Sequence, residues 1–81
     1  MPDYLSRRNK LRKLFEDYAQ ASVFFDQVSI RYLTGFSGSN AALFVSQDEK
    51  SDLLFTDSRY TKRAEVEATD IEARIDRNFI K

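Results

Sequence analysis

The chain has 81 residues, of which 42% are hydrophobic and 32% charged, and its thirteen basic residues balance thirteen acidic ones. A net charge of zero gives no electrostatic reason to expect nucleic acid or an acidic membrane surface as a partner. The sequence has no cysteine and no histidine, which excludes disulfides, a Ser-His-Asp triad and the common zinc sites in this chain. It also lacks an apolar run of the ~20 residues that a membrane span needs. We therefore expect one cytoplasmic domain, residues 1–81.

Residues 3–20 are predicted to form an amphipathic helix that begins near Asp3. Four apolar side chains recur at the spacing i, i+3, i+4 and i+7 that places them on one helix face: Leu11, Leu14, Phe15 and Tyr18. The opposite face carries five basic side chains: Arg7, Arg8, Lys10, Arg12 and Lys13. This basic face is expected to be solvated, with the docking of an acidic partner as the alternative.

The next segment reads as a strand followed by a short helix. Residues 21–25 are brief, apolar and aromatic, which favours a strand buried on both faces. Asp26 is then placed to cap a helical turn over residues 27–33. Three side chains of this turn are expected to face inward: Ile30, Leu33 and Thr34. Gly35 is the expected helix terminator, because glycine adopts the left-handed conformation without a steric penalty.

A loop over residues 36–40 leads into the second half of the chain. Residues 41–46 and 52–56 read as strands that are joined by the polar hairpin loop 47–51. Asp57 or Ser58 is expected to cap a helix that ends near Ala68. Apolar residues then alternate with charged ones from Ile71 to Asp76, which predicts a fourth strand with one solvated face. The predicted fold class is α/β, with a mixed β-sheet flanked by helices.

Both glycines of the chain lie in the segment Gly35-Phe36-Ser37-Gly38-Ser39. This segment is no nucleophile elbow, because G-x-S-x-G needs a glycine at position 39 and the chain has no histidine to act as a base. Two glycines three apart also fit neither the Walker A motif nor G-x-G-x-x-G. Two interpretations stay open. The backbone N–H groups of residues 38–40 cradle an anion, or the glycines and Asn40 only shape the entry to a strand.

The segment Thr56-Asp57-Ser58-Arg59-Tyr60-Thr61 lies where a strand should turn into a helix. A lone carboxylate at position 57 makes a poor metal site, because no second ligand stands at a useful spacing. The structural alternative assigns Asp57 and Ser58 to capping and Tyr60 to anchoring in the core beside Ala64. Arg59 would then bridge to a carboxylate or to a carbonyl of the 35–40 loop.

Together, the segment from Ile30 to Asn40 and the segment from Thr56 to Thr61 resemble the N-terminal domain of the creatinase and Xaa-Pro aminopeptidase (aminopeptidase P, prolidase) family. The family signature reads roughly N-I-R-Y-L-T-G-F-S-G-S, followed by T-D-G/S-R-Y-T. The resemblance covers nearly the whole chain, and Ser58 stands where glycine is frequent in the family. The resemblance favours aminopeptidase P over prolidase only weakly. The family domain continues beyond this sequence, so the chain is expected to be a truncated domain.

This resemblance implies a partner domain that carries the chemistry. In the family, a separate catalytic domain with a pita-bread fold holds two divalent metal ions through Asp, His and Glu ligands, and creatinase works without metal. The metal-dependent members remove a residue that precedes proline or cleave Xaa-Pro dipeptides. The expected cofactor is therefore a divalent metal, manganese, in the catalytic domain, with no catalytic residue, cofactor or metal ligand in this chain. Expected partners are that domain, a neighbouring subunit of a homo-oligomer, and proline-containing peptides.

The resemblance also assigns roles to residues of this chain. It implies that the domain pairs subunits and that the 36–40 loop reaches towards a neighbouring active site. The residues expected at this entrance or subunit contact are Tyr32, Phe36, Ser37, Gly38, Ser39 and Asn40. Structural roles are expected for Gly35 with positive φ, and for Asp57, Arg59 and Tyr60. Phe36 is expected to be exposed. The alternative function is a free-standing protein-binding adaptor with the same fold.

Overall fold

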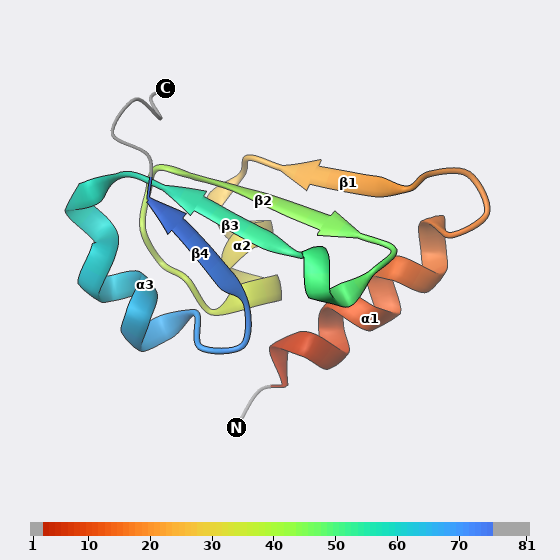
Figure 1. Cartoon of the computed structure of the whole chain (residues 1–81), viewed down its shortest axis with the longest axis horizontal. Helices are drawn as coiled ribbons and strands as arrows, with labels where there is room; N and C mark the ends of the chain where they lie inside the picture. The colour runs from red at the N-terminus through yellow and green to blue at the C-terminus, as the bar shows by residue number, and fades with distance from the viewer. Residues whose placement is uncertain (1–2, 76–81) are drawn as a thin grey trace.

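The computed structural model describes residues 3–75 and contains a four-stranded sheet with three α-helices (Figure 1). The elements in chain order are α1 (Tyr4–Phe15), β1 (Ala21–Phe24), α2 (Gln27–Thr34), β2 (Ala41–Ser46), η1 (Glu49–Ser51), β3 (Leu53–Thr56), η2 (Ser58–Tyr60), α3 (Thr61–Glu67) and β4 (Glu72–Ile75). The predicted order of helices and strands is confirmed, and so is the mixed sheet. Two short 3-10 turns, η1 and η2, are added to it.

The sheet has the strand order β1-β2-β3-β4. The pairs β1–β2 and β2–β3 are antiparallel, and β3–β4 is parallel. Leu43 of β2 stands opposite both Phe24 of β1 and Leu54 of β3, so these three side chains share one face of the sheet. The helix α3 forms the crossover between the two parallel strands, as parallel neighbours require.

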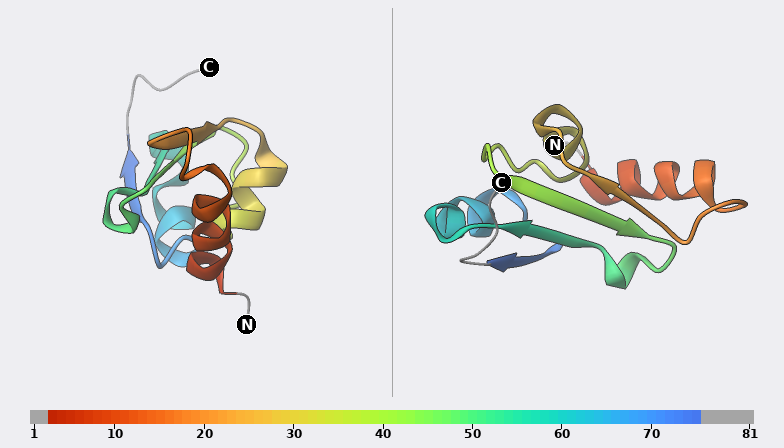
Figure 2. Two further views of the ribbon diagram at one scale, coloured as in Figure 1. Left: turned by 90° about the vertical axis from the view of Figure 1, so that its right-hand side faces the viewer. Right: turned by 90° about the horizontal axis from the view of Figure 1, so that it is seen from above.

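The hydrophobic core lies between that face and the helices. Its buried cluster joins residues of the sheet with residues of α1, α2 and α3: Phe15, Ile30, Leu33, Phe36, Ala41, Leu43, Val45, Leu54, Ala64 and Ala68. All three helices therefore pack against one face of the sheet, as the two views of Figure 2 show. The fold is two-layered over the described residues.

Helix α1 is shorter than predicted and turns a different face to the core. It begins after Asp3, whose carboxylate accepts a hydrogen bond from the Ser6 N–H, and it ends at Phe15 instead of residue 20. Gln20 is no longer helical: its carbonyl accepts a hydrogen bond from the Gln47 N–H, next to the pair of strands β1 and β2. Leu14 and Tyr18, predicted to be inward, are 72% and 79% exposed.

The expectation of a fully solvated basic face is wrong for two of its five residues. Arg8 and Arg12 are buried, and together with Phe15 they make up the inner side of α1. They are buried because the carboxylate of Asp52, just before β3, accepts hydrogen bonds from both guanidinium groups. The helix therefore meets the sheet through charged side chains as well as apolar ones.

The strands β1 and β4 at the edges of the sheet are less buried than predicted. Val23 of β1 is about half exposed and Phe25 lies beyond the strand with 72% exposure, so this segment is not buried on both faces. All four residues of β4 are exposed, including Ile75. The central strand β2, by contrast, has the predicted bounds and is largely buried.

Candidate functional site

Helix α2 leads into the 36–40 loop, and the residues predicted from the sequence cap both of its ends. The Asp26 carboxylate accepts a hydrogen bond from the Ser29 N–H. Hydrogen bonding by the Ser29 side chain, and then by its N–H, lowers the pKa of Asp26. Ile30, Leu33 and Thr34 are buried, as predicted. Gly35 ends the helix with φ of 82°, in the left-handed region, and donates its N–H to the Arg31 carbonyl. This confirms the predicted terminator. A Cβ at Gly35 would also lie 2.8 Å from the Tyr4 ring.

Phe36 is fully buried, so the expectation that it is exposed is wrong. Its N–H donates to the Thr34 hydroxyl, which directs the side chain into the core. The ring meets Tyr60 edge-on at 5.8 Å between centroids. Gly38 lies over the same ring, and a Cβ there would come within 2.6 Å of Phe36 Cε2. The second glycine is therefore required by the close approach of an aromatic ring, and Phe36 is a core residue of this chain.

Ser37 ties the loop to helix α3. Its N–H donates to Glu67 Oε1 at 2.8 Å, and its hydroxyl also contacts both carboxylate oxygens of Glu67. Arg63 donates to the Ser37 hydroxyl from the other side, at 3.2 Å. The amide of Gln27 donates to the Ser37 carbonyl, which adds a contact with α2. The hydroxyl of Ser37 is thus engaged in a structural network between α2 and α3.

Ser39 and Asn40 tie the end of the loop to the segment after β3. The Ser39 and Tyr60 hydroxyls share a hydrogen bond of 2.7 Å, which lowers the pKa of Tyr60. Asn40 Nδ2 donates to Asp57 Oδ2 at 2.8 Å. Ser39 is the one exposed residue of positions 35–40. The loop therefore presents Ser39 to solvent on a backbone that is held from both sides.

Asp57 caps the η2 turn and binds Arg59, as the structural interpretation predicted. It accepts the Arg59 N–H at 3.0 Å and pairs with the Arg59 guanidinium at 2.7 Å. These hydrogen bonds, with a smaller contribution from Asn40, hold the pKa of Asp57 well below its usual range and raise that of Arg59. Tyr60 is partly buried and packs against the core. The bridge and the anchor are present, but the predicted cap is displaced: Asp57 caps the η2 turn, and helix α3 begins at Thr61 without a side-chain cap.

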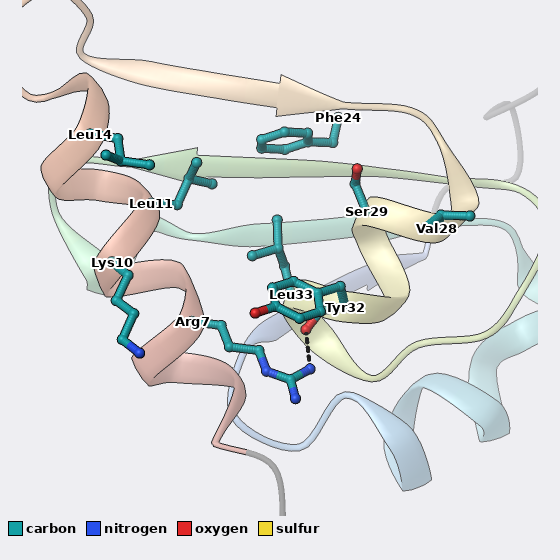
Figure 3. A pocket seen from close by; sticks show the side chains of 9 residues that line it. All are labelled: Arg7, Lys10, Leu11, Leu14, Phe24, Val28, Ser29, Tyr32 and Leu33. Atoms are coloured by element: carbon teal, nitrogen blue, oxygen red, sulfur yellow. Dashed lines mark hydrogen bonds between the residues drawn. The ribbon is translucent and has the colours of Figure 1, made fainter.

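Tyr32, the sixth residue predicted at the entrance, lies apart from the loop. It is an exposed residue of α2 and faces a groove between α1 and α2 (Figure 3). Arg7 of α1 lies over its ring at 4.2 Å and donates to its carbonyl oxygen at 2.8 Å. The structure therefore brings together residues 36–40 with Asp57, Arg59 and Tyr60, and separates Tyr32 from them.

The sequence analysis missed a buried charge network at the other end of the sheet. Asp52 accepts hydrogen bonds from Arg8 Nε at 3.0 Å and from Arg12 Nη1 at 2.6 Å, and from the Ser46 N–H at 3.1 Å. Arg8 also donates to the Leu33 carbonyl and to Asp70. The one signal that sequence offered is the spacing of Arg8 and Arg12 by one helical turn, which places both on one face.

The family model of the creatinase/prolidase N-terminal domain matches residues 7–78. The chain belongs to this family. The N-terminal domain of the cytoplasmic peptidase PepQ from Mycobacterium tuberculosis H37Rv is 42% identical, with a TM-score of 0.82, over 89% of this chain and 56% of that one. No curated protein sequence matches the chain.

Two further solved structures show how far the family resemblance extends. Aminopeptidase P from Streptococcus thermophilus is 29% identical, with a TM-score of 0.75, over 94% of this chain and 59% of that one. X-Pro aminopeptidase from Thermotoga maritima MSB8 is 33% identical, with a TM-score of 0.75, over 86% of this chain but 20% of that one. This creatinase/prolidase-type chain thus spans less than two thirds of the length of each of these relatives.

The described part of this creatinase/prolidase-type domain contains neither a cluster of metal-ligating side chains nor a helix that could span a membrane. Within residues 3–75, no three side chains of His, Cys, Asp or Glu gather in a way that could hold a metal ion. None of the helices in this part of the chain is long and apolar enough to span a membrane.

Proposed function

We propose that the chain is the non-catalytic N-terminal domain of a metal-dependent Xaa-Pro aminopeptidase or dipeptidase. The observation that carries this proposal is the match between nearly the whole chain and about one fifth of the X-Pro aminopeptidase from Thermotoga maritima. A domain of that share leaves most of the longer enzyme for a catalytic part. The family membership of residues 7–78 supports the same assignment.

The metal of the proposed enzyme, a divalent ion such as manganese, is assigned to its catalytic domain. The described residues of this chain offer no convergent set of ligands, and a two-metal site needs several. The proposed partners are therefore that catalytic domain, a neighbouring subunit of a homo-oligomer, and proline-containing peptides as substrates. The proposed location is the cytoplasm, where the similar PepQ is described as a cytoplasmic peptidase.

The proposed contribution of this domain is to pair subunits and to shape the entrance of a neighbouring active site through the 36–40 loop. Burial of Phe36 and Gly38 leaves Ser39 as the exposed position of the loop. Contacts from Glu67, Tyr60 and Asp57 hold the loop in one conformation. A preorganised loop positions a substrate at a lower entropic cost than a mobile one.

The loop proposal is tested in the full-length enzyme by replacing Ser39 with Trp. A bulky side chain at the entrance should lower kcat/KM for an Xaa-Pro peptide about tenfold, because substrate positioning is sensitive to small displacements. Ser51→Trp is the matched control, since Ser51 is also exposed but lies in η1 at the other end of β3. Equal kinetics in both variants would contradict a role of the loop at the active site.

The alternative function is a free-standing protein-binding adaptor with the same fold. One observation favours it: Lys10 and Lys13 of α1 are exposed and form no ion pair within residues 3–75. The reading frame beyond the codon for Lys81 distinguishes the two functions. A continuation with spaced Asp, His and Glu ligands supports the peptidase, and a stop codon supports the adaptor.

A further inference from the structure

A groove of about 480 Å³ lies between α1 and α2, on a different surface from the 36–40 loop (Figure 3). Helix α1 contributes one wall, α2 the other, and Phe24 of β1 closes one side. Its apolar lining residues come from all three elements: Leu11, Leu14, Phe24, Val28 and Leu33. Ser29 and Tyr32 are its uncharged polar lining residues. The groove is thus an apolar depression between two helices.

The apolar rim of this groove is exposed to solvent. Leu14 on the α1 side is 72% exposed, and Val28 on the α2 side is 80% exposed. Tyr32 is exposed as well. Contiguous apolar surface with polar residues at its border marks association sites on soluble proteins. Exposed apolar side chains on both rims suit a polypeptide that lies across the groove, because a small ligand enclosed between the walls would leave them in water.

The charged residues that line the groove are both cations. Arg7 lies over the Tyr32 ring and donates to the Tyr32 carbonyl, but has no acidic partner among the described residues. Lys10, one helical turn from Leu14, has no ion pair there either. No carboxylate lines the groove. A complementary partner therefore brings apolar side chains together with negative charge.

We propose that this groove binds an amphipathic acidic helix of a partner polypeptide. Apolar side chains at i, i+3, i+4 and i+7 of that helix fill the groove, and carboxylates beside them meet Arg7 and Lys10. A helix fits better than an added strand, because a strand needs a row of unpaired backbone groups and both walls are helices. The helices of residues 3–75 do not supply this occupant, because α3 exposes a single large apolar side chain, Val66.

The probe for this proposal is a synthetic helical peptide with leucines at those four positions, glutamates on both flanks and one tryptophan. The chain has no tryptophan, so the fluorescence of the mixture reports on the peptide alone. The acidic peptide should bind the 81-residue chain, and a version with lysine in place of every glutamate should bind about tenfold more weakly. A version with serine in place of the leucines should not bind.

Two pairs of matched variants locate the binding. Val28→Asp and Lys10→Glu should each weaken binding of the acidic peptide about tenfold, because they place a negative charge in the groove. Their controls are Val66→Asp and Lys62→Glu, which make the same changes at exposed positions of α3 and should leave the affinity unchanged. Circular dichroism of all four variants verifies that each one is folded.

Three outcomes would overturn the proposal. The acidic peptide fails to bind the folded chain, or the α3 variants weaken binding as much as the groove variants do. In the third outcome, sedimentation shows that the chain self-associates and that Val28→Asp abolishes the association, which assigns the groove to a second copy. None of these results bears on the kinetics of Ser39→Trp, so this inference and the proposed function fail separately.

Discussion

Asp52 and Asp57 lie at the two ends of strand β3, directly before Leu53 and directly after Thr56. Asp52 is buried and binds Arg8 and Arg12, two side chains of a helix about forty positions earlier in the chain. Asp57 is also buried, with 8% exposure, but it binds Arg59, which lies two residues along the chain and is largely exposed. One carboxylate therefore joins helix α1 to the sheet through two buried cations, whereas the other shapes a local turn and binds Asn40 of the neighbouring loop.

This difference determines how each carboxylate contributes to stability. Removing one partner of a buried ion pair leaves an uncompensated charge in a medium of low polarity, which is strongly destabilising. An exposed partner such as Arg59 is solvated by water when its pair is lost, so exposed ion pairs contribute little. The end of β3 at Asp57 is held instead by packing of Phe36 against Tyr60 and by the loop that covers them.

The largest expected effect is that of Asp52→Asn. This change keeps the shape of the side chain but removes the carboxylate that Arg8 and Arg12 share, and among the described residues it leaves Arg8 only its ion pair with the partly exposed Asp70. It should therefore lower the free energy of unfolding by about 3–5 kcal/mol. Urea denaturation measures the effect. Asp17→Asn, at an exposed position, is the control and should change the stability by less than about 0.5 kcal/mol. Equal effects of the two changes would refute the importance of the buried network.

At the other end of β3, Phe36→Ala tests whether aromatic packing stabilises the fold there, as the buried ion pairs of Asp52 do at the first end. The ring is fully buried, so its removal should cost about 3–5 kcal/mol of unfolding free energy. Phe25→Ala removes an aromatic ring that is 72% exposed and should cost much less. Thermal unfolding of both variants provides the comparison. A stable Phe36→Ala domain would mean that the loop is not packed as described.

Gly35→Ala probes the backbone of the same loop and should have a smaller effect. A Cβ is unfavourable at a φ of 82°, and the Tyr4 ring would have to move away from it, so the loss should be roughly 1 kcal/mol or more. The crystal structure of the variant would show whether α2 ends at the same residue. No change in stability would indicate that residue 35 tolerates a side chain.

Asp57→Asn should have the smallest effect, and one that depends on pH. The folded-state pKa of Asp57 lies below the unfolded value of about 3.9, so the native state binds fewer protons and gains stability as pH rises. The contribution is fully present above about pH 4 and is lost as pH falls through the folded pKa. The melting temperature of the wild type should therefore exceed that of the variant at pH 7, and the gap should narrow below pH 4. A constant gap would contradict this linkage.

Sequence reasoning succeeded where the signal is local. The Asp26 cap, the left-handed Gly35 and the bounds of Ala41–Ser46 each depend on residues within one turn or one strand. The burial of Arg8 could not be predicted from local sequence, because it requires Asp52 to lie beside α1, and only the folded sheet places it there. The position of Phe36 was misjudged because the role implied for the loop suggested exposure. Its burial depends on Tyr60, which lies far along the chain.

The entrance role of residues 37, 39 and 40 remains a prediction. Their contacts fix the shape of the loop, but the neighbouring subunit towards which it would reach lies outside this chain. Tyr32 shows the limit of a contiguous sequence motif, since it lies in the last turn of α2 shortly before the loop and yet lines the groove between α1 and α2. Side chains four residues apart would share a face of a continuing helix. Tyr32 and Phe36 diverge because α2 ends between them, where Gly35 adopts the left-handed conformation and changes the direction of the chain.

The bonds of Arg8 have a consequence for the order in which the fold assembles. Its guanidinium contacts Asp52 and Asp70, partners 44 and 62 positions later in the sequence. During synthesis from the N-terminus, Arg8 of α1 therefore meets both of these carboxylates only after Asp70 has emerged, whereas the hairpin β2–β3 can pair as soon as its own residues emerge. We expect the first helix of this chain to be among the last elements to dock.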